Sequence, residues 1–168
     1  MMLDIALDAD EDWDSSRFTE QSVRRAAEAA IAESAFPQLA DFGRTVELSV
    51  RLTGDEQVRV LNAHWRGKDK PTNVLSFPMA EEAELRDESF AEAELLLGDI
   101  ILARGVCAAE ATEKGVPFES HATHLIVHGT LHLLGYDHSD ERDAMDMEAR
   151  EIRALERLGI ANPYEVHH

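Results

Sequence analysis

Five of the eight histidines of this 168-residue chain lie between residues 121 and 138. The first four are spaced three or four residues apart: His121, His124, His128 and His132. On a helix this spacing places the four side chains on one face. Two imidazoles one helical turn apart can reach the same metal ion, so the segment predicts a metal site.

A third ligand for such an ion must come from beyond the helix. His132 is followed by LLGYDH, in which Gly135 allows the chain to turn and His138 can fold back towards His128 and His132. Three neutral nitrogen ligands with one open position are typical of catalytic zinc sites, where the ion lowers the pKa of bound water. The spacing therefore predicts that these three histidines bind one metal ion. Three imidazoles also suit copper, nickel and iron, so the residues leave the metal's identity open.

The residue after the first predicted ligand argues against one class of zinc enzyme. Proteases with an H-E-x-x-H motif use the glutamate as a general base, and this chain has Gly129 at that position. His121 and His124 share the helix face, but one ion cannot use five histidines. We expect these two to support the site or to lie in the core. We assign no role to His167 and His168 at the C-terminus.

A basic segment, residues 66–78 (RGKDKPTNVLSFP), is the second candidate functional feature. The chain has 16 Lys and Arg against 34 Asp and Glu, a net charge of −18 that repels other polyanions. Within the segment, Asp69 alone opposes three cations, Arg66, Lys68 and Lys70. Guanidinium groups bind phosphate through paired hydrogen bonds, so this local reversal of charge indicates a phosphate site. A solvated turn of mixed charge is the alternative for three basic residues alone.

Hydrophobic periodicity predicts the elements that must position these residues. Alternation of apolar and polar residues predicts strands at 3–8 and 45–52. A short strand bounded by prolines is expected at 73–77, and a buried strand at 95–102. Helical spacing predicts helices at 18–34, 55–63, 103–114, 117–134 and 140–158. The helix at 117–134 is apolar nearly all round, which predicts a central, buried position. The inner face of the last helix is expected to contain Met145, Ala149, Ile152 and Leu155.

Two further segments of the sequence carry local predictions. Gly98 interrupts a buried strand, which indicates a bulge or a close backbone approach. Residues 81–94 hold seven acids and one arginine, and we expect a loop or a poorly ordered insertion there. The single cysteine, Cys107, excludes an internal disulfide scaffold.

Together these elements predict the α+β class. We expect a single domain over residues 1–168, with a small mixed sheet of about four strands packed against about five helices and a central His-bearing helix. No apolar run approaches the ~18 residues of a membrane-spanning helix, and the N-terminus lacks the pattern of a secretory signal. We therefore expect a cytoplasmic protein with no membrane partner.

Three segments of the chain resemble those of a known family. HGTLHLLGYDH resembles the signature of the YbeY family of bacterial endoribonucleases, also called rRNA maturation factors. LNAHWRGKDKPTNVLSFP and LLGDIIL are similar to that family's two other characteristic segments, in the same order. The resemblance covers roughly Leu61 to Asp140. It implies one zinc ion bound by His128, His132 and His138, and an arginine, here Arg66, in the cleft near the metal.

The resemblance also implies what the protein acts on. Members process single-stranded ribosomal RNA, notably the 16S rRNA 3′ end, and take part in ribosome quality control. We therefore expect a zinc-dependent endoribonuclease whose partners are RNA and the ribosome or its proteins. Two alternatives stay open: a ribosome-associated assembly factor with a structural zinc, and a zinc hydrolase that acts on another substrate.

A mechanism follows as a hypothesis from the residues and the resemblance together. Arg66 neutralises charge that develops on the phosphoryl group, and Lys68 and Lys70 hold flanking phosphates. Asp99 or Asp137 accepts the outer ring proton of a ligand histidine. Either water or a 2′-hydroxyl could be the attacking group, and the sequence does not decide between them.

Overall fold

The computed structural model describes residues 2–13, 18–40, 45–86 and 94–164. The strands are β1 (Met2–Ala9), β2 (Thr45–Thr53), β3 (Val74–Pro78) and β4 (Leu95–Ala103). The α-helices are α1 (Glu20–Ala32), α2 (Asp55–Arg66), α3 (Glu82–Arg86), α4 (Arg104–Lys114), α5 (Phe118–Leu133) and α6 (Glu141–Arg157). Two short 3-10 helices are η1 (Glu11–Trp13) and η2 (Pro37–Ala40). The four predicted strands and five predicted helices are confirmed to within a few residues.

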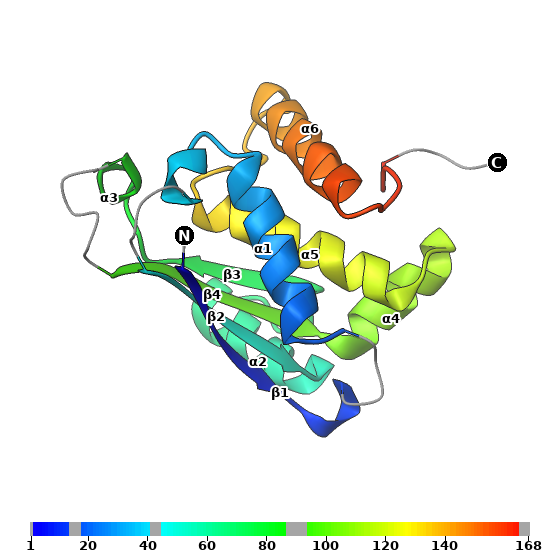
Figure 1. The fold of residues 1–168 in the computed structure, drawn as a ribbon. Coiled ribbons are helices and arrows are strands. Elements are labelled where there is room, and N and C mark those ends of the chain that lie inside the picture. The colour runs from blue at the N-terminus through cyan, green and yellow to red at the C-terminus, as the bar shows by residue number, and fades with distance from the viewer. Residues whose placement is uncertain (1, 14–17, 41–44, 87–93, 165–168) are drawn as a thin grey trace.

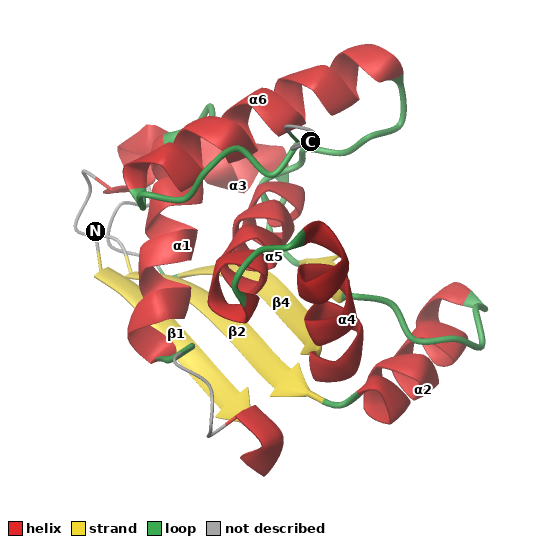
Figure 2. Cartoon of the chain, turned by 90° about the vertical axis from the view of Figure 1, so that its right-hand side faces the viewer, coloured by secondary structure: helices red, strands yellow, loops and turns green. Residues whose placement is uncertain are grey.

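The four strands form one mixed sheet in the order β1-β2-β4-β3. β1 and β4 both run parallel to β2, and β3 runs antiparallel to β4 at the edge of the sheet. Helices α1 and α5 cover one face and α2 lies on the other, as Figures 1 and 2 show. None of the helices in the described ranges has the length and hydrophobicity to span a lipid bilayer. The arrangement confirms a single α+β domain.

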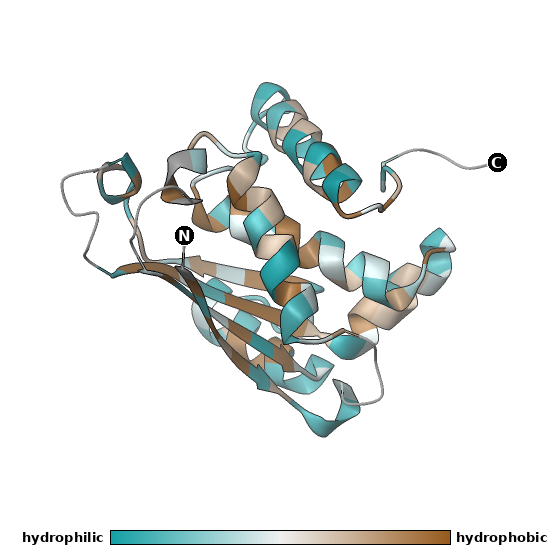
Figure 3. Ribbon diagram, viewed as in Figure 1, coloured by the Kyte–Doolittle hydropathy of each residue, from teal (hydrophilic) through white to brown (hydrophobic). Residues whose placement is uncertain are grey.

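The core lies mainly between the sheet and the layer of α1 and α5. β2 buries four side chains towards this core, as its alternation predicts: Val46, Leu48, Val50 and Leu52. Helix α5 is buried along most of its length, so its predicted central position is confirmed. A smaller apolar cluster joins α2 to the sheet and contains Val58, Leu75, Ile101 and Ala103. Figure 3 shows hydrophobic residues concentrated in the strands and hydrophilic residues along much of α6.

Two glycines allow close approaches that position the His-bearing helix. A Cβ at Gly129 would lie 3.1 Å from Cδ1 of Ile100, so α5 crosses β4 at close range. Gly98 has a φ of 140°, and a Cβ there would lie 2.2 Å from the carbonyl oxygen of Phe77. The register of β2 against β4 shifts next to Gly98, which confirms the predicted bulge.

Two predictions about local structure need correction. The acidic segment 81–94 contains the short helix α3, in which Leu85 is buried, whereas residues 87–93 lie outside the described residues. The inner face predicted for α6 is wrong at Met145, whose side chain is 65% exposed. The buried residues of this helix are Met147, Glu151, Ala154 and Leu155. A prediction from hydrophobic residues alone does not place an acid on the inner face of a helix. In this structure Glu151 lies on that face.

Candidate metal centre

The C-terminal part of α5 and the turn after it bring the three predicted ligands together. Helix α5 ends at Leu133, and Gly135 then adopts a φ of 100°, which reverses the chain. One ring nitrogen from each of His128, His132 and His138 lies within 4.8 Å of the others. The two Nε2 atoms of His128 and His132 are 3.0 Å apart. We call these three residues the His triad.

The protonation state of His132 suits a metal ligand. Burial, followed by the nearby charges of His128 and His138, lowers the pKa of His132 to about 4. A histidine with this pKa is neutral at neutral pH, so its free nitrogen can act as a ligand. His128 and His132 are partly buried and His138 is exposed. The triad thus includes a neutral ligand at His132 and extends to the protein surface at His138, where a substrate can approach.

A buried carboxylate fixes the orientation of one ligand. Oε1 of Glu151, on α6, lies 2.6 Å from Nδ1 of His128, and the Glu151 side chain is fully buried. Burial acts to raise the pKa of Glu151, but hydrogen bonds with His124 and His128 outweigh it and hold the pKa well below its usual range. Glu151 is therefore ionised and accepts the Nδ1 proton of His128. Nε2 of His128 is left free to bind a metal.

Two further side chains hold Glu151 in place. The hydroxyl of Tyr164 donates a hydrogen bond to Oε2 of Glu151 at 2.7 Å. Nε2 of His124 lies 3.3 Å from Oε1 of Glu151, and its ring meets the ring of Tyr164 edge to face. Residues near the end of the chain therefore complete the support of a ligand on α5.

The two other histidines of the α5 face have carboxylate partners rather than a place in the triad. His124 contacts Glu151, and Nε2 of His121 lies 2.8 Å from Oε1 of Glu110 on α4. Glu110 also accepts a hydrogen bond from the side-chain amide of Asn73 at 3.1 Å. Burial lowers the pKa of His121, against the effect of Glu110. These contacts agree with the supporting and core roles expected for both residues.

The basic segment lies where α2 ends against β3. Arg66 is the last residue of α2, and its guanidinium donates to the carbonyl oxygen of Ser76 at 3.4 Å. Lys68 and Lys70 follow in an exposed loop. Asp69, the acid between them, forms an ion pair with Arg59. Among the described residues, Arg66 and the two lysines form no ion pair, so their charges are available to a phosphate.

The strands connect the basic segment to the helix of the His triad. Ser76 pairs with Ile100 of β4, and Ile100 is the residue that packs beneath Gly129. Strand β3 also packs directly against α5. Two adjacent strands therefore connect Arg66 and His128. Arg66 contacts β3, and β4 packs against α5, which carries His128.

Comparison with known proteins decides which family this fold and site belong to. A family model described as endoribonuclease YbeY matches residues 9–159. The chain belongs to the YbeY family. A protein of Rhizorhabdus wittichii named endoribonuclease YbeY is 49% identical over 98% of this chain and 98% of that protein. A protein of the same name in Sphingopyxis alaskensis is 52% identical over 97% of this chain and 98% of that protein.

A solved structure has a similar fold to this chain. The solution structure of a Thermotoga maritima protein aligns with a TM-score of 0.55 and covers 98% of this chain and 100% of that one. The two sequences are 22% identical, so the likeness concerns the fold alone.

In this YbeY-family chain, Asp99 and Asp137 do not make the hydrogen bond to a ligand histidine that was expected of one of them, within the described residues. Ile100 faces α5, and because side chains alternate along a strand, Asp99 points to the opposite face of the sheet. Asp137 accepts hydrogen bonds from the backbone and hydroxyl of Ser139. Within the described residues neither carboxylate hydrogen-bonds a triad histidine, and Glu151 occupies that place at His128. An acid interrupting the apolar positions of the last helix was the available sequence signal.

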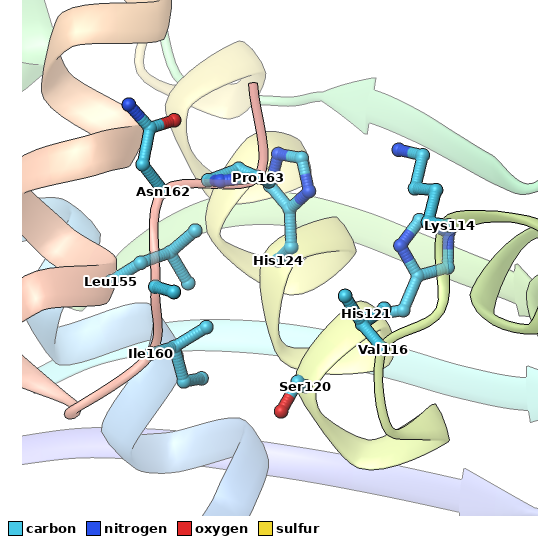
Figure 4. Close-up of a pocket in the computed structure, with 10 residues that line it drawn as sticks. Lys114, Val116, Ser120, His121, His124, Leu155, Ile160, Asn162 and Pro163 are labelled. Atoms are coloured by element: carbon cyan, nitrogen blue, oxygen red, sulfur yellow. The ribbon is translucent and has the colours of Figure 1, made fainter. Parts of the chain in front are cut away.

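Two hollows border the histidine face of α5. One of about 410 Å³ lies beside the triad and is lined by His132 and Tyr136, with Arg150 stacked over the Tyr136 ring. The other, of about 180 Å³, lies against His121 and His124, away from the triad. Figure 4 shows His124 between the segment carrying Asn162 and Pro163 and the side chain of Lys114. The hollow beside His132 is the one that can receive part of a substrate reacting at the triad.

Proposed function

We propose that this chain is a zinc-dependent endoribonuclease that cleaves single-stranded ribosomal RNA, including the 3′ end of 16S rRNA, in ribosome maturation and quality control. The observation that carries the proposal is the His triad, with His128 oriented by the buried carboxylate of Glu151. The names of relatives at about 50% identity support the same activity. Such a role would place the protein in the cytoplasm.

The donor set of the triad fits a zinc ion. Zinc prefers nitrogen ligands, and three histidines leave a fourth position for water or substrate. Bound there, zinc would supply Lewis-acid chemistry, polarising a phosphoryl oxygen or lowering the pKa of a water molecule. Glu151 would keep His128 in the tautomer that binds metal through Nε2.

The remaining residues would act on the phosphates of the substrate. Arg66 would hold the phosphoryl group under attack and stabilise the charge that grows on it. Lys68 and Lys70, exposed and without ion partners in the described part of the chain, would bind flanking phosphates. The hollow beside His132 would receive a neighbouring part of the RNA.

The ribosome or its proteins are the proposed partners. A net charge of −18 opposes binding of RNA over the whole surface. Binding confined to the basic segment would be weak for free RNA. A partner that delivers the RNA would compensate for this weak affinity.

The test compares purified wild type with His132→Ala and Arg66→Ala on a labelled single-stranded RNA. We expect wild type to contain about one metal ion per chain, as the single triad predicts, and to cleave the RNA. His132→Ala should lose both metal and cleavage, whereas Arg66→Ala should keep the metal and lose cleavage. Arg142→Ala is the matched control, because it removes the same charge from an exposed position on α6.

Two results would contradict this proposal. Equal cleavage by all variants would identify the nuclease as a contaminant. Unfolding on metal removal, combined with full function of Arg66→Ala in cells, would favour an assembly factor with a structural metal. We expect metal-free protein to stay folded, because α5 is held by apolar residues of the core.

A further inference from the structure

The two tryptophans of the chain lie in opposite environments. The Trp13 side chain is 2% exposed, and its indole donates a hydrogen bond to the carbonyl oxygen of Thr53. Trp65, in the last turn of α2, is 64% exposed. An exposed indole gains little of the free energy that burial of an aromatic ring provides. The exposure of Trp65 therefore needs a functional explanation.

Trp65 is held in a defined place against the edge strand of the sheet. Its ring centroid lies 6.2 Å from that of Phe77 and 4.7 Å from that of His64, and both pairs meet edge to face. The next residue, Arg66, donates to the carbonyl oxygen of Ser76, which precedes Phe77. Two consecutive residues of α2 therefore contact two consecutive residues of β3, so the indole and the guanidinium are fixed side by side.

The surroundings of the indole are cationic. Arg66, Lys68 and Lys70 lie within five positions of Trp65 and form no ion pair in the described ranges, because Asp69 is paired with Arg59. Exposed aromatic rings beside unpaired cations are typical of surfaces that bind single-stranded nucleic acids. The centre of a protein interface, in contrast, is depleted of charged residues. In a chain with a net charge of −18, this combination favours a polyanion with stackable rings.

We propose that Trp65 is a stacking platform for an unpaired base of the RNA substrate, whose adjacent phosphates lie on Arg66, Lys68 and Lys70. The inference rests on the proposed function and extends it to a specific binding site. An exposed indole can stack on any single-stranded base, whereas the bases of a duplex already stack on one another. The platform would therefore favour single-stranded over double-stranded RNA.

The end of β3 connects the platform to the proposed site of cleavage. The carbonyl oxygen of Phe77 closely approaches Gly98, and Leu133, the residue after His132, packs at the same point. Pro78, which follows Phe77, lines the hollow that also contains His132. In this proposal, a strand of RNA anchored on Trp65 passes over the end of β3, at Pro78, into the hollow that contains His132.

Tryptophan fluorescence reports directly on this contact, because Trp13 is buried and Trp65 is exposed. The probe is a short single-stranded 2′-O-methyl oligonucleotide, which has no 2′-hydroxyl to act as the attacking group. It is added to metal-loaded protein, and gel electrophoresis after the titration checks that it stays uncut. We expect the oligonucleotide to quench the emission of wild type. In Trp65→Phe, where Trp13 alone emits, the same addition should leave the emission unchanged.

The RNA affinities of two Trp65 variants distinguish stacking on an aromatic ring from the effect of side-chain size. Anisotropy of a labelled oligonucleotide should show that Trp65→Ala binds about 5- to 150-fold more weakly, the range for loss of one base stack. Trp65→Phe keeps an aromatic face and should stay within about 3-fold of wild type. Val60→Ala is the matched control, because Val60 is an exposed apolar residue of the same helix, at 53%. Thermal unfolding of each variant checks that the fold is retained.

The outcomes separate this inference from the proposed function. Cleavage by wild type with no quenching at Trp65 and full affinity of Trp65→Ala would overturn the platform alone, and would leave a protein as the partner of this surface. Quenching and loss of affinity without any cleavage would support the platform and contradict the nuclease proposal. Equal weakening by Val60→Ala and Trp65→Ala would also overturn the platform.

Discussion

Oε1 of Glu151 lies 2.6 Å from Nδ1 of His128. This contact joins a fully buried carboxylate on α6 to a proposed metal ligand on α5. The two residues are 23 positions apart in sequence. Carboxylates that accept the outer proton of a ligand histidine fix its orientation and raise its basicity. In this chain the carboxylate comes from α6, outside the histidine-rich segment of α5.

Glu151→Gln tests this relationship. The substitution keeps the shape of the side chain but removes its charge, so we expect metal affinity to fall by about 10- to 100-fold. Competition with a chelating indicator measures the affinity. Glu156→Gln, at an exposed position of the same helix, should bind metal like wild type. Equal affinity of both variants would argue against a role for Glu151 in holding His128.

The contrast between the His triad and Glu151 explains what the sequence could predict. His128 and His132 are one helical turn apart and His138 follows a glycine turn, so local geometry was enough to group them. The contact of Glu151 with His128 depends on how α6 packs against α5, and a single acid among apolar positions does not show which residue it will contact. The buried face of α6 contains Glu151, whereas Met145, an apolar residue, is exposed.

The strands and the long helices were predictable for a similar reason. Alternation in β2 and the apolar length of α5 are local signals that burial preserves. Helix α3 was missed because it lies in an acidic segment of the sequence. Leu85 is its one buried residue, and Arg86 lies over the ring of Phe36. The stacking of Trp65 at the edge of β3 required knowledge of which strand lies beside α2.

The hydroxyl of Tyr164 should stabilise both the fold and the metal site. It donates to Oε2 of the buried Glu151 at 2.7 Å, so Tyr164→Phe leaves a charged acceptor with one partner fewer. We expect the free energy of unfolding to fall by about 1–3 kcal/mol, with weaker metal binding. Urea unfolding measures the first and chelator competition the second. In a Glu151→Gln background the effect of Tyr164→Phe should shrink, and an undiminished effect would argue against their coupling.

Acid should destabilise the metal-free protein through His121. Burial lowers the pKa of this histidine below its ordinary value near 6.5, so the unfolded chain binds its proton more readily than the folded one. The contribution of His121 to stability is therefore complete above pH ~6.5 and is lost as the pH falls below it. His132 adds a loss of the same sign, because its pKa is lowered to about 4.

Urea unfolding of metal-free protein at several pH values isolates the contribution of His121. In His121→Gln, an amide nitrogen can take the place of Nε2 beside Glu110, and no proton is taken up in this range. The variant should lose less stability than wild type between pH ~7.5 and ~5.5. Parallel curves for the two proteins would mean that His121 does not contribute to the acid response.

The salt dependence of RNA binding should be shallow, because few cations are available to phosphate. Single-stranded RNA releases about 0.7 counterions per neutralised phosphate, so contacts from Arg66, Lys68 and Lys70 predict a slope of about −2 in log K against log salt. Removing both lysines by Lys68→Ala and Lys70→Ala should reduce the slope to about −0.7. A much steeper slope for wild type would require phosphate contacts over a wider surface, which the net charge of −18 opposes. Anisotropy titrations at increasing salt distinguish a local contact of this kind from a long RNA-binding track.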